Sequence, residues 1–427
     1  MLGAEFIDTI SSWDIQHQVG VEDFADRWNF LFTTGVLIMC TVIVAARQYI
    51  VGEPITCFIP SQVSGSTFED YMENICWVQG TYPLPVDSQF SNTEEFWKSL
   101  ASKKLMYYQW VPFILGLQTM LFYLPRIVWL ALASRRSGAD SQALVARAAE
   151  AGTSDGEDRE KIVHQTAVDL EQLLLLAKRS ELSRGALSKL LGAGKRLSSG
   201  LTTGYLFVKL LYLANGIGQL YLMQTFLRLG ASNHSSVLYG AEILSNIAAG
   251  RDWRSTMVFP RVTFCRTEFA IFGGTQRYIA QCALPVNMLN EKIYIFLWFW
   301  MAIGLLITAL SVPAWLLRVA SCRGRSRYVR RHLQLRQEGL ADKRLVGEFV
   351  DRFLRHDGVF LLKMMQMNVG DLVTGMSLCT CTACGCGSTA RGWEASTRSC
   401  HWRLDPRFDV AEFIFATLID QHWSLSW

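Results

Sequence analysis

Four cysteines in two polar segments are the residues best placed for covalent chemistry. Cys57 and Cys76 lie in one segment between long apolar stretches, and Cys265 and Cys282 lie in another. Paired cysteines in exposed loops on an oxidising side of a membrane favour two disulfides over free thiols. No histidine stands near them at the spacing of zinc ligands, which disfavours a metal site. Four cysteines can pair in three ways, and this choice stays open at the level of spacing.

The stretches around these segments are typical of membrane spans. Half of the 427 residues are hydrophobic and only 18% are charged, whereas about a quarter are charged in soluble domains. A hydrocarbon core requires about 20 apolar helical residues, and four windows supply them: Trp28–Ala46, Leu105–Ala133, Leu210–Leu227 and Ile293–Leu317. We therefore predict a four-pass protein. The acidic N-terminal stretch lacks the basic start of a signal peptide.

The flanking charges predict an orientation. Cytoplasmic flanks of membrane spans are enriched in Arg and Lys, and a run of arginines follows the fourth window: Arg318, Arg323, Arg325, Arg327, Arg330 and Arg331. Both termini and the middle loop are thus expected in the cytoplasm, with the cysteine segments outside. Lys209 and Arg126 lie at span ends, and we expect them to reach the headgroups without a further role.

Several sequence words are more specific than composition. They are Gln48–Cys57, Tyr107-Tyr108-Gln109-Trp110-Val111-Pro112, Phe259–Cys265, Gln281–Asn287 and Asn290–Trp300. With them the chain resembles the innexins, the gap-junction channel subunits of invertebrates that are related to pannexins. The resemblance extends from about residue 1 to residue 374.

The resemblance implies a fold and an activity. The fold is an all-α polytopic membrane protein, a four-helix transmembrane bundle with disulfide-stapled extracellular loops and a helical cytoplasmic dome. In the family the disulfides are nested, which pairs Cys57 with Cys282 and Cys76 with Cys265. The implied function is passive passage of ions and small molecules between adjacent cells, without a cofactor or bound nucleic acid. The implied partners are membrane lipid, innexin subunits of the same or another type in a ring of eight, and the docked ring of an apposed cell at a plasma-membrane gap junction.

The expected division of the chain follows the four windows. Its parts, in order, are a pore-funnel segment (1–27), the first span (28–50), an extracellular loop (51–104), the second span (105–133), a cytoplasmic loop (134–203), the third span (204–229), a second extracellular loop (230–292), the fourth span (293–317), the dome (318–378) and a divergent tail rich in Cys, Gly and Ser (379–427).

Two features near the pore carry open alternatives. In related channels the N-terminal segment folds into the pore mouth, where Glu5, Asp8 and Asp14 would form rings of negative charge that favour cations. The alternative is an interfacial helix whose acids are solvated. Pro112 lacks an N–H and is expected to kink the second span, either as a gating hinge or as a static bend.

Other functions remain as alternatives. Asn233 begins a glycosylation sequon, and a glycan there would favour an undocked, pannexin-like hemichannel that releases ATP or other solutes. A four-span adhesion scaffold is disfavoured because claudins and tetraspanins have short inner loops and other cysteine patterns. The spans contain no paired carboxylates, histidine cluster or nucleophile with a base, so we expect no enzyme activity.

The tail contains a second group of cysteines. Cys379, Cys381, Cys384 and Cys386 lie close together in the chain and could hold a soft metal such as zinc. A disordered tail, an alternative exon or an altered reading frame would explain the same sequence. We interpret the segment as a disordered tail without an assigned function.

Overall fold

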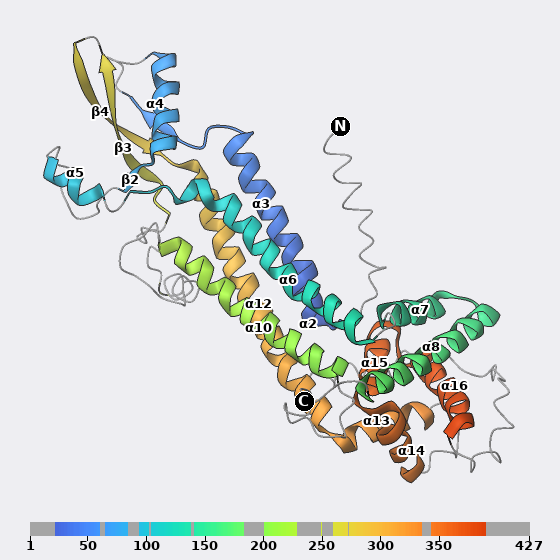
Figure 1. The fold of residues 1–427 in the computed structure, drawn as a ribbon. Coiled ribbons are helices and arrows are strands. Elements are labelled where there is room, and N and C mark those ends of the chain that lie inside the picture. The colour runs from blue at the N-terminus through green and yellow to red at the C-terminus, as the bar shows by residue number, and fades with distance from the viewer. Residues whose placement is uncertain are drawn as a thin grey trace.

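Four long helices form the middle of the molecule. The computed structural model describes residues 22–59, 65–83, 94–101, 104–137, 141–182, 200–228, 249, 259–271, 273–334 and 343–389. Within them, four helices are long and apolar enough to cross a membrane: Phe24–Tyr49, Tyr107–Ala133, Gly200–Phe226 and Pro285–Ala320. Figure 1 shows them side by side between a small sheet and a group of shorter helices. The predicted helical, four-span fold is confirmed.

The spans are built from regular and irregular helix. The first contains α2 (Phe24–Arg27), a π-helical segment (Trp28–Thr33) and α3 (Thr34–Tyr49). The second contains a 3₁₀ turn (Tyr107–Trp110) and α6 (Val111–Ser137). The third is α10 (Gly200–Arg228), and the fourth is α12 (Pro285–Ala320). Only 28–33% of the most apolar window of each span is buried within the chain, so most of each window lies on the surface of the chain.

The π-helical segment fits the first span closely against the fourth. The rings of Trp28 and Trp300 stack with centroids 4.6 Å apart, and Trp300 Nε1 donates to Thr33 Oγ1 at 3.0 Å. A Cβ atom on Gly304 would lie 2.7 Å from Trp28 Nε1, closer than real contacts allow. The absence of a side chain at Gly304 therefore lets the Trp28 ring pack against the backbone of α12.

Pro112 lies inside the second span, near its start. It is the second residue of α6, directly after the 3₁₀ turn, where a missing N–H interrupts no helical hydrogen bond. The proline inside α6 is Pro125, and α12 contains Pro313. Pro112 thus marks the start of α6 and the change from 3₁₀ to α-helix within the span, and the expected kink stays a prediction.

The two segments that hold the cysteines combine in one sheet, which hydropathy did not predict. Its strands are β1 (Thr56–Phe58), β2 (Tyr82–Pro83), β3 (Val262–Ile271) and β4 (Gly274–Ala283). The order is β1-β4-β3-β2 with antiparallel neighbours. Helix α4 (Ser66–Gln79) packs on the sheet, and α5 (Glu94–Ala101) lies beside it. We call β1–β4 with α4 and α5 the stapled sheet.

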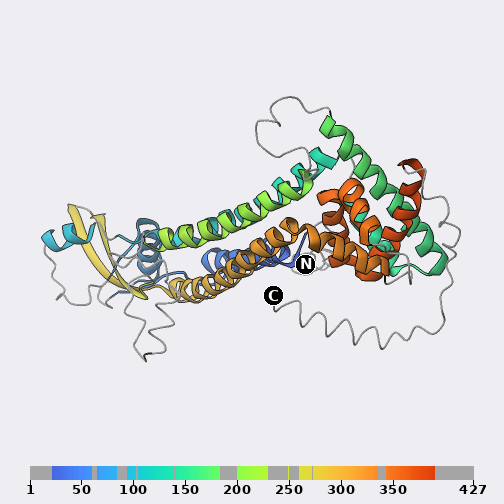
Figure 2. The ribbon, with the colours of Figure 1, turned by 90° about the horizontal axis from the view of Figure 1, so that it is seen from below.

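The opposite end of the bundle carries a group of helices that we call the dome. Its members are α7 (Ser141–Thr153), α8 (Gly156–Leu182), α13 (Cys322–Gln334), α14 (Lys343–Phe349), a π-helical turn (Val350–Leu354), α15 (Arg355–Val369) and α16 (Asp371–Thr389). Figure 2 shows the dome and the sheet at opposite ends of the four spans. Leu170, Leu361 and Met365 are fully buried in its core. Helix α16 continues past residue 378, where the tail was expected to begin.

Candidate functional site

Two disulfides hold the stapled sheet together. Cys57 and Cys282 face each other across β1 and β4 and are bonded, with their Cα atoms 4.0 Å apart. Cys76 of α4 is bonded to Cys265 of β3, and their Cα atoms are 5.7 Å apart. These are the nested pairs that the family resemblance implies. Each bond joins the first inter-span segment to the second, so the two segments form one rigid unit.

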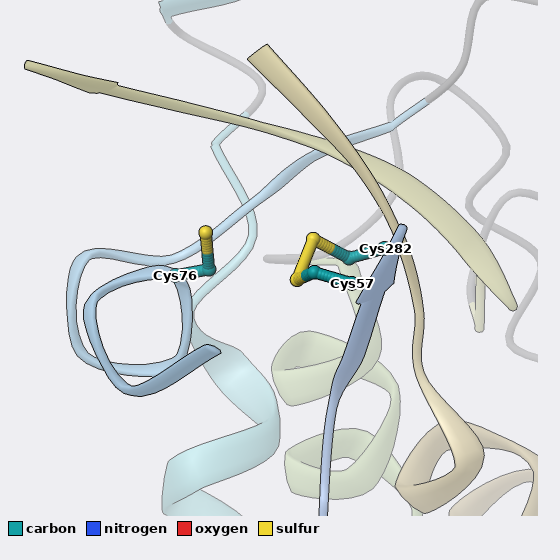
Figure 3. A group of neighbouring side chains, drawn as sticks. All are labelled: Cys57, Cys76 and Cys282. Carbon is teal, nitrogen blue, oxygen red and sulfur yellow. A yellow bond between two sulfur atoms is a disulfide. The ribbon is translucent and has the colours of Figure 1, made fainter. Parts of the chain in front are cut away.

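The sulfur atoms of the two disulfides lie close together. Those of Cys57, Cys76 and Cys282 are all within 4.8 Å of one another, and Figure 3 shows Cys76 beside the bond between the other two. A metal would require thiolates, whereas each of these sulfurs is already bonded to another. The grouping therefore represents two neighbouring disulfides.

The sequence word Tyr107-Tyr108-Gln109-Trp110 anchors the sheet to the bundle. Tyr108 is fully buried, and its ring packs on Trp77 of α4 at 4.8 Å. Gln109 Nε2 donates to the backbone oxygen of Trp77, and Gln48 Nε2 donates to that of Tyr108 at 2.7 Å. These residue types thus join the first span, the second span and α4, while Trp110 is 59% exposed.

A buried charge cluster holds the start of the first span at the dome end of the bundle. Lys209 of α10 is fully buried and forms ion pairs with Asp23 and with Asp26, the latter at 2.8 Å. Asp23 Oδ2 also accepts from Ser311 Oγ at 2.9 Å and from Trp315 Nε1 at 2.7 Å. The first, third and fourth spans therefore meet at two carboxylates.

The cluster also includes the second span and a hydroxyl. Arg126 Nε of α6 lies 3.3 Å from Glu22 Oε1, and its guanidinium lies 4.0 Å from the centre of the Phe30 ring. Tyr205 OH donates to Asp26 Oδ2 at 2.6 Å. We call Glu22, Asp23, Asp26, Arg126, Tyr205 and Lys209 the charge cluster; it reaches all four spans.

The expected role of Lys209 and Arg126 was wrong. They do not extend to the headgroups, because the acids that precede the first span pair with them inside the bundle. The local contacts of the acids depend on neighbouring residues alone: Asp23 and Asp26 form a capping box at the start of α2. The meeting of these acids with residues far along the chain had no signal in the sequence.

Hydrogen bonds connect the dome to the same region. Asp357 of α15 accepts from the N–H groups of Leu201 and Thr202 at 3.2 and 2.9 Å. The carboxylate accepts from backbone N–H groups that have no partner within the first turn of α10. Its negative charge also interacts favourably with the partial positive charge at the N-terminus of that helix. Arg27 donates to Asn368 Oδ1 of α15, so the dome holds both the first and the third span.

Burial in this region changes the protonation of Glu22. Removal from water raises its pKa from 4.5 to about 7, with Arg126 opposing and Asp26 adding to the shift. The folded protein therefore binds a proton at Glu22 more tightly than an unfolded chain does. The stabilisation from that proton is complete below pH 4.5 and is lost as the pH rises through about 7.

We expect the Glu22→Gln variant to have a flatter dependence of thermal stability on pH than the wild type. The shift corresponds to at most about 3 kcal/mol across this window. The measurement is the melting temperature of the purified protein, followed by tryptophan fluorescence from pH 5 to pH 8 (about the interval over which the shift acts). Glu157→Gln, at an exposed site on α8, should keep the wild-type profile. Parallel profiles for Glu22→Gln and wild type would contradict the assignment.

Several predicted residues lie outside the part of the chain that the structure describes. They are Glu5, Asp8 and Asp14 of the funnel, Asn233 of the sequon, and the side chains of Cys381, Cys384 and Cys386. Cys379 is buried in α16. The funnel, the glycan and the metal alternative are thus not tested by the geometry.

Comparison with known proteins extends these observations. The family model described as "Innexin" matches residues 22–382. Innexin unc-9 of Caenorhabditis elegans is 35% identical over 355 residues, covering 82% of this chain and 89% of its own length. Innexin-19 of Caenorhabditis briggsae is 32% identical over 380 residues, covering 83% and 84%. Innexin-3 of C. elegans is 31% identical over 375 residues, covering 88% and 86%.

The match begins at Glu22, the first residue of the charge cluster, and ends inside α16, so it includes the four spans, the stapled sheet and the dome. Both disulfides and the Tyr107–Trp110 word lie within it. The chain belongs to the innexin family, whose members form gap-junction channels between cells.

Proposed function

We propose that this chain assembles with further innexin subunits into a ring of eight around one pore, and that the ring docks with its counterpart in an adjacent cell. The stapled sheet is the observation that carries the docking part. It gathers both inter-span segments at the end of the molecule farthest from the dome, and two disulfides fix it. A surface that must match a second ring benefits from such preorganisation.

The proposed orientation places the sheet outside the cell and both termini inside. Disulfides form on the oxidising side of the plasma membrane, which favours the sheet as the extracellular end. The arginine run lies at the dome end, with Arg318 on α12 and the other arginines on α13, as the enrichment of basic residues on cytoplasmic flanks predicts. The division into loops, spans and dome follows, and the funnel of residues 1–27 remains a prediction.

The proposed pore carries ions and small molecules passively. The surfaces of the spans that are not buried within one chain provide contact with neighbouring subunits and with lipid. The charge cluster keeps the start of the first span inside the bundle at the dome end. In a ring, this would place each N-terminal segment near the cytoplasmic mouth.

Dual whole-cell recording from paired cells that express only this protein tests the proposal. We expect junctional current together with dye transfer, and native mass spectrometry of the purified ring should give the mass of eight chains. Uptake of dye by single cells without junctional current would favour the undocked hemichannel. Surface expression without either signal would contradict the proposal for a ring of this subunit alone, and co-expression with another innexin would then test a mixed ring.

A further inference from the structure

A cavity lies at the junction of the fourth span and the dome. It has a volume of about 550 Å³ and is lined by residues of α12, α13 and α15 together with Thr202 of α10. This is within the range of about 300–1,000 Å³ that is usual for small-molecule sites. The family function described above does not use it.

One side of the cavity is apolar and continuous with the membrane-facing surface of α12. Leu310, Pro313 and Leu317 line it, and Leu310 and Leu317 are 64% and 71% exposed. They belong to the uncharged run from Ile293 to Leu317, which is long enough to cross the hydrocarbon region and which we expect to lie within it. An acyl chain can therefore reach this side directly from the bilayer.

The other side carries positive charge. Arg318, Arg325 and Lys363 line the cavity, and no carboxylate is among its described lining residues. Arg318 is the first charged residue after the uncharged run, which places it at the level of lipid phosphates. Its guanidinium lies 5.3 Å from the centre of the Trp315 ring, at the boundary between the two sides.

The ammonium of Lys363 can accept a further anionic partner. Burial lowers the pKa of Lys363 to about 8, and the nearby Arg318 adds to this effect, with Asp371 opposing it. Asp371 is already engaged, since His332 Nε2 lies 3.3 Å from its Oδ1 and Gln366 donates to the same atom. Lys363 Nζ donates to Gln366 Oε1 at 2.6 Å, and an ammonium has three donors. An anion in the cavity would thus stabilise the charged lysine.

His356 provides a further polar atom at the cavity. Its Nδ1 is buried and has no hydrogen-bond partner among the described residues. A buried polar atom of this kind costs free energy unless a ligand or water satisfies it. The cavity therefore combines an apolar side open to lipid, several cations and one unsatisfied ring nitrogen.

We propose that this cavity binds an anionic phospholipid from the leaflet next to the dome, with its phosphate at Arg318 and Lys363 and one acyl chain along Leu310, Pro313 and Ala314. A free phosphate would leave the apolar side empty. A zwitterionic lipid would bring its own cation toward the arginine and lysine side chains. An anionic lipid matches both sides of the cavity and joins the fourth span to the dome.

Photolabelling of the assembled full-length protein in phosphatidylcholine nanodiscs tests this proposal. The probe is phosphatidylserine with a diazirine on its acyl chain, and the adducts are mapped by peptide mass spectrometry. We expect adducts on the segment from Leu310 to Leu317. Unlabelled phosphatidylserine should compete for them, whereas inorganic phosphate should not. The Arg318→Gln/Lys363→Gln variant should be labelled about tenfold less, because it loses charge-assisted hydrogen bonds to the phosphate.

Two further variants test whether labelling depends on the cavity itself. Lys161→Gln removes an exposed cation of α8 and should be labelled as the wild type is. Ala314→Phe should reduce labelling by filling the cavity while the charges remain. The variants are compared only where the assembled protein elutes as the wild type does in size-exclusion chromatography. Equal labelling by a diazirine phosphatidylcholine, adducts spread evenly over the four spans, or competition by inorganic phosphate would overturn the proposal. Because the readout is binding, it does not depend on whether the rings dock.

Discussion

The Lys209→Met variant is expected to lose assembly and surface expression. Lys209 is fully buried and is the ammonium partner of both Asp23 and Asp26. Methionine has a similar length but leaves two buried carboxylates without their cation. Breaking a buried ion pair in this way costs about 3–5 kcal/mol, which is a large part of the stability of a typical domain. Surface biotinylation and fluorescence-detected size-exclusion chromatography measure the outcome.

A charge-neutral version of the cluster separates loss of charge pairing from loss of packing. Adding Asp23→Asn and Asp26→Asn to Lys209→Met removes the uncompensated carboxylates, and asparagine remains a good N-cap residue for α2. This triple variant should recover part of the assembled fraction. Lys161→Met on the exposed surface of the dome should behave as the wild type. Normal assembly of Lys209→Met alone would show that the buried pairs contribute little.

The second large effect is expected from the disulfides, and it should depend on how they are removed. The Cys57→Ser variant leaves Cys282 as a free thiol close to the sulfur of Cys76. The Cys282 thiolate can attack that sulfur, form a Cys76–Cys282 bond and release Cys265 as a thiolate. One substitution would thus disturb both staples. The Cys57→Ser/Cys282→Ser variant would lose only one of them.

We therefore expect the single variant to be more damaged than the double variant. Loss of one native disulfide costs about 2–5 kcal/mol, so the double variant should assemble poorly yet retain Cys76–Cys265. The single variant should contain the exchanged bond, have no junctional current and be less stable. Disulfide mapping by mass spectrometry under non-reducing conditions, together with paired-cell recording, measures both effects. An intact Cys76–Cys265 bond in the single variant would contradict the exchange.

The parts of the fold that depend on long stretches of one chemistry were predictable. The Ile293–Leu317 run identified the fourth span because bilayer thickness dictates its length. Family resemblance added the disulfide pairing, which spacing alone left open. Strand β2 consists only of Tyr82 and Pro83, which is too short for alternation to reveal. Strands β3 and β4 have ten residues each, and they were missed because a search for long apolar runs does not detect half-exposed strands.

The parts that depend on distant partners were not predictable. The position of Lys209 at a span end indicated a headgroup contact, and only the folded bundle places it beside Asp23. The 3₁₀ turn before Pro112 also had no signal in the sequence, because its residues continue the span without a break. For Lys209, the local sequence was compatible with two structures, and tertiary packing selected between them.

The strand order of the sheet has a consequence for how such subunits diversify. The hairpin β3–β4 from the second inter-span segment lies in the centre, and β1 and β2 from the first segment form the two edges. A substitution in one segment that changes which ring it docks with must then preserve the backbone hydrogen bonds and the disulfide that this segment shares with the other. The two segments form one heritable module, and a chimera between relatives has to exchange them as a set.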